Sequence, residues 1–210
     1  NMIIHVVGKI GSGKSTISHY IESEYGLVYL ETDEIIKRLY NLDVFLKWVD
    51  ENAPQIKNPD GTFDRSLFRS ILFRNKALNL NLLKLTLPIV AEWIKDIVDE
   101  NPDQNYVIES FFIELVEKVT VDQIIIVKSK EIETLIKRIK GRDKRSYSET
   151  LAIVTFQNEY INRNYYDNRE LDDQIRHKLT VVYNEDGMLE KTFETIDEVM
   201  ENIGLKKIES

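Results

Sequence analysis

The sequence predicts a three-layer α/β fold, in which helices cover both faces of a parallel sheet of about five strands. Short apolar runs alternate with helical stretches along the chain, which is typical of parallel βαβ units. Two of these runs, at residues 28–30 and 124–127, are apolar at every position, as expected for strands buried on both faces. A glycine-rich turn at residues 8–13 separates the first apolar run from the first helix.

The individual elements follow from the apolar runs and from the residues that interrupt them. Strands are expected at residues 2–7, 27–30, 106–109, 123–127 and 179–183. Helices are expected at about residues 13–25, 33–40, 43–51, 64–99, 130–141 and 195–203, with further helical segments up to about residue 170. Gly26 ends the first helix, and Pro88 is expected to start or kink a helix inside the fourth helical stretch. Two prolines and an Asp-Gly pair mark residues 52–63 as a loop.

Composition and charge exclude several functional classes. The net charge of −8 argues against a dedicated nucleic-acid binder, because such proteins carry an excess of basic residues. The absence of cysteine excludes disulfides, thiolate metal sites and cysteine nucleophiles. No apolar run of about 18 residues occurs, so no membrane span is expected. We therefore expect a cytoplasmic protein, a monomer or small homo-oligomer, whose partner is a small molecule rather than nucleic acid or membrane.

The glycine-rich turn fits the phosphate-loop pattern G-x-x-x-x-G-K-[ST] at every fixed position. Its three glycines are expected to adopt backbone angles closed to residues with a Cβ atom, so that the loop turns its N–H groups inward around a polyanion. The following helix adds the positive end of its dipole. Lys14 can bridge the β- and γ-phosphates of ATP, Ser15 can ligate Mg²⁺, and Thr16 can reach the α-phosphate. The predicted nucleotide-binding residues of the loop are Gly8, Ile10, Gly11, Ser12, Gly13, Lys14, Ser15 and Thr16.

The motif predicts a P-loop NTPase fold, because it lies between a predicted strand and a predicted helix, where a chance match is rare. A GTPase would carry an Asn-Lys-x-Asp motif, but residues 75–78 lack its aspartate. A motor ATPase would carry an apolar strand ending in Asp-Glu, but Glu109 is followed by Ser110. The small size and a basic segment at residues 138–145 favour a small-molecule kinase that uses ATP with Mg²⁺.

One domain is expected over residues 1–210, because this length suits a single hydrophobic core. Two helix-rich insertions interrupt the strand pattern. The first, at about residues 43–100, is the candidate for a helical acceptor-binding lobe. The second, at about residues 130–170, holds the basic segment and is the candidate for a lid.

Beyond the loop, the sequence resembles the dephospho-coenzyme A kinase family. Three further segments carry the resemblance, in the family's order. Val28–Ile35 resembles a strand that ends in Asp-Ala-Asp, with Glu31 in place of the first aspartate. Asp60–Leu67 resembles the family's pattern of glycine, Asp-Arg and leucine. Arg138–Asp143, with Gln157 downstream, resembles its lid.

This resemblance implies ATP-dependent phosphorylation of the ribose 3′-hydroxyl of dephospho-coenzyme A. The sequence departs from the family where His-Pro is replaced by Leu87-Pro88 and where Pro-Leu-Leu-Phe-Glu is replaced by residues 110–114. Two alternatives stay open. The first is a nucleoside or nucleoside monophosphate kinase on the same fold, and the second is a nucleotide-binding regulator without catalysis.

The resemblance and the residue chemistry together point to catalytic and acceptor-binding side chains. Asp33 lies at the carboxyl edge of the second strand, beside the loop, where it can take the proton of the acceptor hydroxyl or hold the magnesium shell; alternatively it caps the next helix. Arg65 is expected to bind the acceptor's pyrophosphate; alternatively it is a surface arginine paired with Asp64. Arg138 and Arg142 share one helix face and are expected to bind the nucleotide and the transferring phosphoryl group; alternatively they belong to a solvated face.

The remaining candidates are three glutamates and two ring side chains. Glu31, Glu109 and Glu114 lie near strand ends, where they can assist magnesium; alternatively they are surface or capping residues. Tyr160 can stack on a base or pack in the core, and His5 is expected to be a structural core residue.

The predicted site residues therefore fall into three groups. The predicted catalytic residues are Lys14, Asp33 and Arg142. The predicted acceptor-binding residues are Asp33, Arg65 and Glu114, and the predicted metal ligand is Ser15.

The substitution Arg142→Ala is expected to lower turnover more than nucleotide affinity, because a lid arginine stabilises the charge that develops during transfer. Steady-state kinetics and a nucleotide-binding titration measure the two effects separately. Equal losses of turnover and affinity would contradict a lid role for this arginine.

Overall fold

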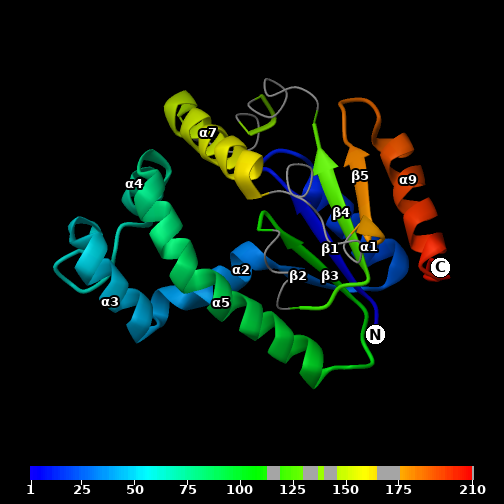
Figure 1. The fold of residues 1–210 in the computed structure, drawn as a ribbon, viewed down its shortest axis with the longest axis horizontal. Helices are drawn as coiled ribbons and strands as arrows, with labels where there is room; N and C mark the ends of the chain where they lie inside the picture. The colour runs from blue at the N-terminus through cyan, green and yellow to red at the C-terminus, as the bar shows by residue number, and fades with distance from the viewer. Residues whose placement is uncertain (113–118, 130–136, 140–145, 165–175, 210) are drawn as a thin grey trace.

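A parallel sheet of five strands, in the order β2-β3-β1-β4-β5, forms the centre of the molecule (Figure 1). The computed structural model describes residues 1–112, 119–129, 137–139, 146–164 and 176–209. The strands are β1 (Ile3–Gly8), β2 (Val28–Glu31), β3 (Tyr106–Ser110), β4 (Gln123–Lys128) and β5 (Leu179–Tyr183). All neighbouring pairs run parallel. The predicted α/β class and parallel sheet are confirmed, and each strand lies within one residue of its predicted bounds.

Helices cover both faces of the sheet, which gives the predicted three layers (Figure 1). Alternate side chains of β1 belong to two different hydrophobic clusters, one on each face. One cluster is completed by α1 and α9, and the other by α5 and α7; these helices span Lys14–Tyr25, Leu189–Asn202, Lys76–Glu100 and Tyr147–Asn164. Because both faces are covered, the central strands are apolar at nearly every position, and this made them recognisable in the sequence.

The helical stretch predicted at residues 64–99 consists of two helices, α4 (Arg65–Arg74) and α5. Asn75 separates them, and its side-chain oxygen accepts a hydrogen bond from Leu78 N at 3.1 Å, which caps α5. Pro88 lies inside α5, so it does not start a helix. The boundary is therefore set by an asparagine cap rather than by the proline.

Two other helices differ from their predicted bounds. The helix expected at residues 33–40 is the short α2 (Thr32–Ile36), followed by a 3₁₀ turn over Lys37–Asn41. The closing helix α9 begins at Leu189 rather than at residue 195. Its first turn leaves Leu189 exposed, so apolar periodicity, the signal used for prediction, starts only further along the helix.

Beside the sheet, α3 (Asp43–Asn52), α4 and part of α5 enclose a third hydrophobic cluster. The rings of Phe45, Trp48 and Phe68 contact one another in this cluster. Figure 1 shows α3 and α4 to one side of the sheet. These helices therefore have a core of their own, which holds them together as a unit.

Among the described helices, α5 is long and apolar enough to cross a membrane when judged by length and composition alone. Core helices of globular proteins meet the same criterion. The second half of α5 supplies buried side chains to the cluster on the sheet, namely Val90, Ala91, Ile94 and Val98. This packing accounts for the apolar composition of the helix.

His5 is buried at the centre of β1, as expected for a structural residue. Its Nε2 lies 2.8 Å from Ser110 Oγ, and that hydroxyl donates to Phe112 O at 3.0 Å. Because the Ser110 hydroxyl proton is used in this bond, His5 Nε2–H donates to Ser110. The buried Nδ1 then carries no proton, and it has no hydrogen-bond partner in the described part of the chain. Burial lowers the pKa of His5 to about 3.

This low pKa predicts a loss of stability in acid. Below about pH 6.5 the histidine becomes protonated in the unfolded chain, whereas the folded chain keeps it neutral down to about pH 3. Between pH 7 and pH 5, His5 should therefore remove about 2 kcal/mol from the free energy of unfolding. The variant His5→Gln keeps a donor for Ser110 but does not titrate. Urea unfolding at the two pH values should show a smaller acid loss for this variant, and equal losses would contradict the assignment.

Candidate active site

The phosphate loop begins where β1 ends, at Gly8, and leads directly into α1. Gly11 and Gly13 have φ angles of 78° and 93°, in the left-handed region that favours glycine. Gly8 was expected to adopt such a backbone angle as well, but its φ angle is not positive. A Cβ atom at Gly8 would instead clash with the Ser12 hydroxyl and lie 3.0 Å from Val127 O. Close approach of β4, rather than backbone angle, therefore requires glycine at this position.

Two carbonyl oxygens of the loop accept hydrogen bonds from outside it. The Asn184 side chain donates to Ser12 O at 3.0 Å, and the Arg138 guanidinium donates to Gly11 O at 3.2 Å. Asn184 packs so closely that a Cβ atom at Gly13 would clash with its amide nitrogen. These contacts hold the carbonyl groups on the outer side of the loop. Asn184 lies just after β5.

The N–H groups of Gly11, Gly13 and Ser15 make no hydrogen bond within the described part of the chain. They lie in the loop or in the first turn of α1, where a helix leaves its N–H groups unsatisfied and its dipole is positive. Lys14 extends over the same loop, with Nζ 3.5 Å from a loop carbonyl oxygen. The Ser12 hydroxyl is buried and has no hydrogen-bond partner among the described residues. This set of donors fits a polyanion such as a triphosphate.

The structure brings Arg138 to the outer side of the loop, at the base of the predicted lid segment. Its guanidinium donates to Asn184 O at 3.1 Å and to Asp186 Oδ1 at 2.9 Å, in addition to the loop carbonyl. The side chain is only 22% exposed, so the alternative of a solvated face is wrong for Arg138.

Two predicted site residues lie outside the described part of the chain. They are Arg142, which was predicted to be catalytic, and Glu114, which was predicted to bind the acceptor.

Two polar residues of α7 also hold the loop. Gln157 Oε1 accepts a hydrogen bond from Ile10 N at 2.8 Å, and Asn158 Oδ1 accepts one from Lys9 Nζ at 2.6 Å. The sequence points to Gln157 only through the family resemblance. Nothing in the sequence points to Asn158, because one asparagine on a helix forms no pattern.

The neighbouring residues of α7 contact the helices beside the sheet. The Phe156 ring packs edge-on against Phe73 of α4, with 6.0 Å between centroids, and Glu159 pairs with Lys76 of α5 at 2.7 Å. Tyr160 is buried in the core cluster, so it packs rather than offering a face to a base. Four consecutive residues of α7 thus connect the phosphate loop to α4 and α5.

Asp33 lies exposed in the first turn of α2, just after β2. The N-cap residue of α2 is Glu31, so the alternative that Asp33 caps this helix is wrong. Asp33 and the phosphate loop follow the carboxyl ends of two parallel strands that are not neighbours, because β3 runs between β1 and β2. Strand order depends on long-range contacts, and the local sequence pattern does not contain it.

A group of carboxylates occupies the carboxyl end of β2 and β3. Glu109 is buried near the end of β3, its carboxylate accepts a hydrogen bond from the Tyr29 hydroxyl, and Glu31 is its neighbour in register on β2. Burial raises the pKa of Glu31, and the negative charges of Asp33 and Glu34 raise it further. This edge of the sheet is therefore anionic and favours a cation.

The oxygen donors near the loop fit Mg²⁺. This ion binds oxygen atoms, keeps several waters and takes few protein ligands when it accompanies substrate phosphates. Ser15 and Thr16 place hydroxyl groups on the first turn of α1, and Glu109 lies on the neighbouring strand β3. Among the described residues, no three histidine or carboxylate side chains lie close enough to bind a metal by themselves. Magnesium would therefore depend on Ser15 and on the phosphates that it accompanies.

A cationic cluster surrounds Tyr40, in the 3₁₀ turn after α2. The Arg65 guanidinium lies over the Tyr40 ring, 5.1 Å from its centroid. Burial raises the pKa of Tyr40; the charges of Arg65, Arg69 and Lys37 oppose this increase, and the charge of Asp33 adds to it. Lys37 is paired with Glu34 at 2.9 Å, so Arg65 and Arg69 are the cations near this ring that favour an anionic ligand.

The alternative that Arg65 pairs with Asp64 is wrong. The Asp64 carboxylate accepts a hydrogen bond from Leu67 N at 3.0 Å and caps α4. Arg65 instead extends over aromatic rings, because Phe63 also lies 6.0 Å from its guanidinium carbon. The guanidinium N–H groups therefore remain exposed to a ligand.

A phosphate loop at the carboxyl end of β1, together with a cationic cluster on the helices beside it, defines a P-loop kinase. The residues that would hold the donor lie in the loop after β1 and in the first turn of α1, and the arginines that would hold an anionic acceptor lie on α4. The chain belongs to the dephospho-CoA kinase family, whose model matches residues 2–176. The resemblance seen in the sequence is thereby confirmed, and membership of a kinase family implies ATP as the phosphoryl donor.

Known proteins resemble this chain over nearly its full length. The dephospho-CoA kinase of Carboxydothermus hydrogenoformans is 28% identical over 200 residues, which cover 92% of this chain and 90% of that protein. The crystal structure of TT1252 from Thermus thermophilus has a TM-score of 0.66 at 21% identity, and the match covers 96% of this chain and 97% of that one. The dephospho-CoA kinase from Campylobacter jejuni has a TM-score of 0.55 at 18% identity, with 96% and 98% covered. The two structures support the fold.

The hydrogen bond from Ile10 N to Gln157 predicts an effect on nucleotide affinity. Gln157→Leu leaves this N–H unsatisfied, at a cost of about 1–2 kcal/mol, and should weaken ATP binding roughly tenfold. Calorimetric titration with ATP measures the change. Thr155→Val, at an exposed position on the same helix, is the matched control and should bind like the wild type. Unchanged affinity in Gln157→Leu would show that the loop keeps its shape without this contact.

Proposed function

We propose that this protein transfers the γ-phosphoryl group of ATP to the ribose 3′-hydroxyl of dephospho-CoA. Membership of the dephospho-CoA kinase family over residues 2–176 is the observation that carries the proposal. It is supported by the N–H groups of Gly11, Gly13 and Ser15, which make no hydrogen bond within the described residues, and by the arginines near Tyr40, because the donor and the acceptor are both anionic.

On the donor side, the loop N–H groups and Lys14 bind and orient the β- and γ-phosphates. Magnesium, when bound with ATP, neutralises phosphate charge, and Ser15 is the residue that would hold it. Arg142, from the predicted lid segment, would stabilise the charge on the transferring group. The contribution of these residues is mainly positioning and electrostatic stabilisation.

On the acceptor side, Arg65 and Arg69 would bind the pyrophosphate and leave the ribose directed toward Asp33. The 3′-oxygen bonds to the γ-phosphorus as the bond from that phosphorus to the β,γ-bridging oxygen breaks. ADP leaves with the bridging oxygen, and the hydroxyl proton passes to the Asp33 carboxylate. Asp33 suits this role because it is exposed at the carboxyl end of the sheet.

The proposal is tested by measuring ATP consumption against a panel of acceptors that includes dephospho-CoA, nucleosides and nucleoside monophosphates. Dephospho-CoA should give the highest kcat/KM. In the control Lys14→Ala, turnover should fall by about a hundredfold or more, because the cation over the β- and γ-phosphates is lost. Its circular dichroism spectrum should match the wild type.

Two outcomes would contradict the proposal. Preference for a nucleoside or nucleoside monophosphate would indicate another kinase on the same fold. Tight ATP binding without turnover of any acceptor would indicate a nucleotide-binding regulator.

A further inference from the structure

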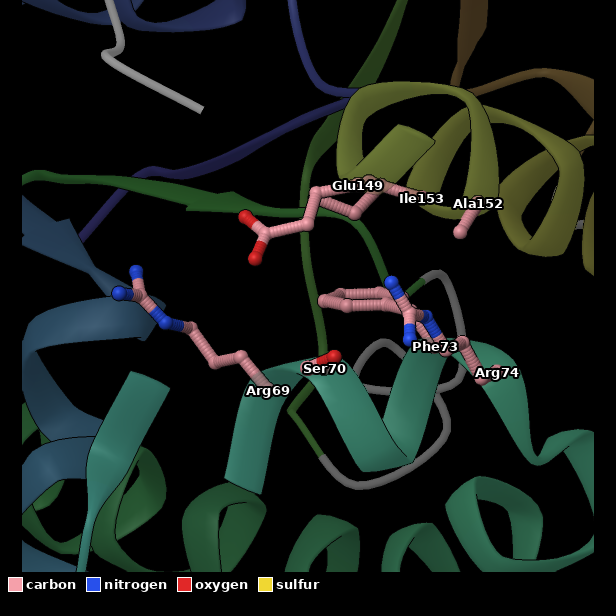
Figure 2. Close-up of a pocket in the computed structure, with 7 residues that line it drawn as sticks. All are labelled: Arg69, Ser70, Phe73, Arg74, Glu149, Ala152 and Ile153. Atoms are coloured by element: carbon pink, nitrogen blue, oxygen red, sulfur yellow. The ribbon is translucent and has the colours of Figure 1, made fainter. Parts of the chain in front are cut away.

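A shallow recess between α4 and α7 brings one carboxylate to the edge of the cationic cluster (Figure 2). Its interior has room for no more than about one water molecule, so a ligand can reach its mouth but cannot enter it. The charged residues among those that line it are Arg69 and Arg74 of α4 and Glu149 of α7. In Figure 2 the Glu149 carboxylate points from α7 toward the side on which Arg69 lies. Glu149 thus places negative charge at a mouth that is otherwise cationic.

The Glu149 carboxylate is available to act on a ligand. In the described part of the chain it forms no ion pair, and neither do Arg69 and Arg74. Glu149 is half-buried in the first turn of α7, where its backbone N–H donates to Ser146 Oγ at 3.2 Å. The positive dipole end of a helix favours a carboxylate there and, without one, would favour a phosphate. Glu149 therefore neutralises a helix end that would otherwise attract an anion.

Glu149 lies at the end of the acceptor site that is far from Asp33. Arg65 and Asp33 affect the pKa of Tyr40 more strongly than Arg69 does, which places Arg69 farther from that ring. Arg69 also lines the recess, so it lies between the ring and Glu149. The proposed function, on which this inference rests, directs the ribose toward Asp33 and places the pyrophosphate at Arg65 and Arg69. The phosphate farther from the ribose is then the one that approaches Glu149.

We propose that Glu149 makes the acceptor site select a diphosphate whose outer phosphate is esterified. In dephospho-CoA this phosphate carries an uncharged arm, so it bears one negative charge. In ADP the same phosphate is free and bears close to two negative charges at pH 7. The additional charge is repelled by the carboxylate. ADP, which the reaction itself produces, is therefore kept out of the acceptor site.

The substitution Glu149→Gln tests the inference, because it removes the charge and keeps the size of the side chain. ADP is measured as a competitive inhibitor against dephospho-CoA, with ATP saturating so that the donor site is filled. The Ki for ADP should fall about fourfold or more in the variant. The KM for dephospho-CoA should fall by about twofold or less, because its outer phosphate bears about half the charge.

Glu194→Gln is the matched control, since it removes the same charge at an exposed position of α9 and should behave like the wild type. Thermal unfolding of both variants shows that the fold is retained. Raising the salt concentration from about 0.05 M to about 0.5 M should bring the Ki values of the wild type and Glu149→Gln together, because salt screens exposed charges. A difference that persists at high salt would contradict an electrostatic role.

The failure of this inference can be told apart from the failure of the proposed function. An unchanged Ki for ADP, or equal changes for ADP and dephospho-CoA, would overturn the role of Glu149 and leave the proposed function standing. If the wild type does not phosphorylate dephospho-CoA, the proposed function fails, and the role of Glu149 fails with it.

Discussion

The phosphate loop keeps its shape because its carbonyl oxygens are hydrogen-bonded from outside. A loop that turns its N–H groups to one side places carbonyl groups on the other, and each buried carbonyl without a donor would cost about 1–3 kcal/mol. Asn184 and Arg138 supply these donors to Ser12 O and Gly11 O. Asn184 follows β5, the edge strand of the sheet, so a loop built from residues near the start of the sequence depends on a turn near its end.

The helix α7 extends this support to the acceptor side. Gln157 and Asn158 bind the loop, while Phe156 and Glu159 contact α4 and α5. An exposed ion pair such as Glu159 with Lys76 contributes little by itself. The buried Gln157 contributes more, because Ile10 N has no other hydrogen-bond partner in the segments that the structure describes. The phosphate loop is therefore fixed relative to α4 and α5 mainly by packing and by the contact of Gln157 with Ile10 N.

Local patterns in the sequence predicted the strands and the phosphate loop well, for physical reasons. Strands buried on both faces must be apolar at nearly every position, and a loop that wraps a polyanion needs glycines at fixed spacing. Long-range contacts were not predictable in this way. The position of Asp33 depended on strand order, the glycine at residue 8 depended on the approach of β4, and Asn158 acts on a loop 149 residues away.

β3 separates the strand of the phosphate loop from the strand that leads to Asp33. Neighbouring strands lie about 4.8 Å apart, so the donor and acceptor supports are about 10 Å apart across the sheet. Under the proposed function, the two substrates meet above the end of β3, over the buried Glu109. A charged carboxylate at that place would favour a triphosphate that carries a divalent counter-ion over a bare one. The end of the sheet would then discriminate between free ATP and its metal complex.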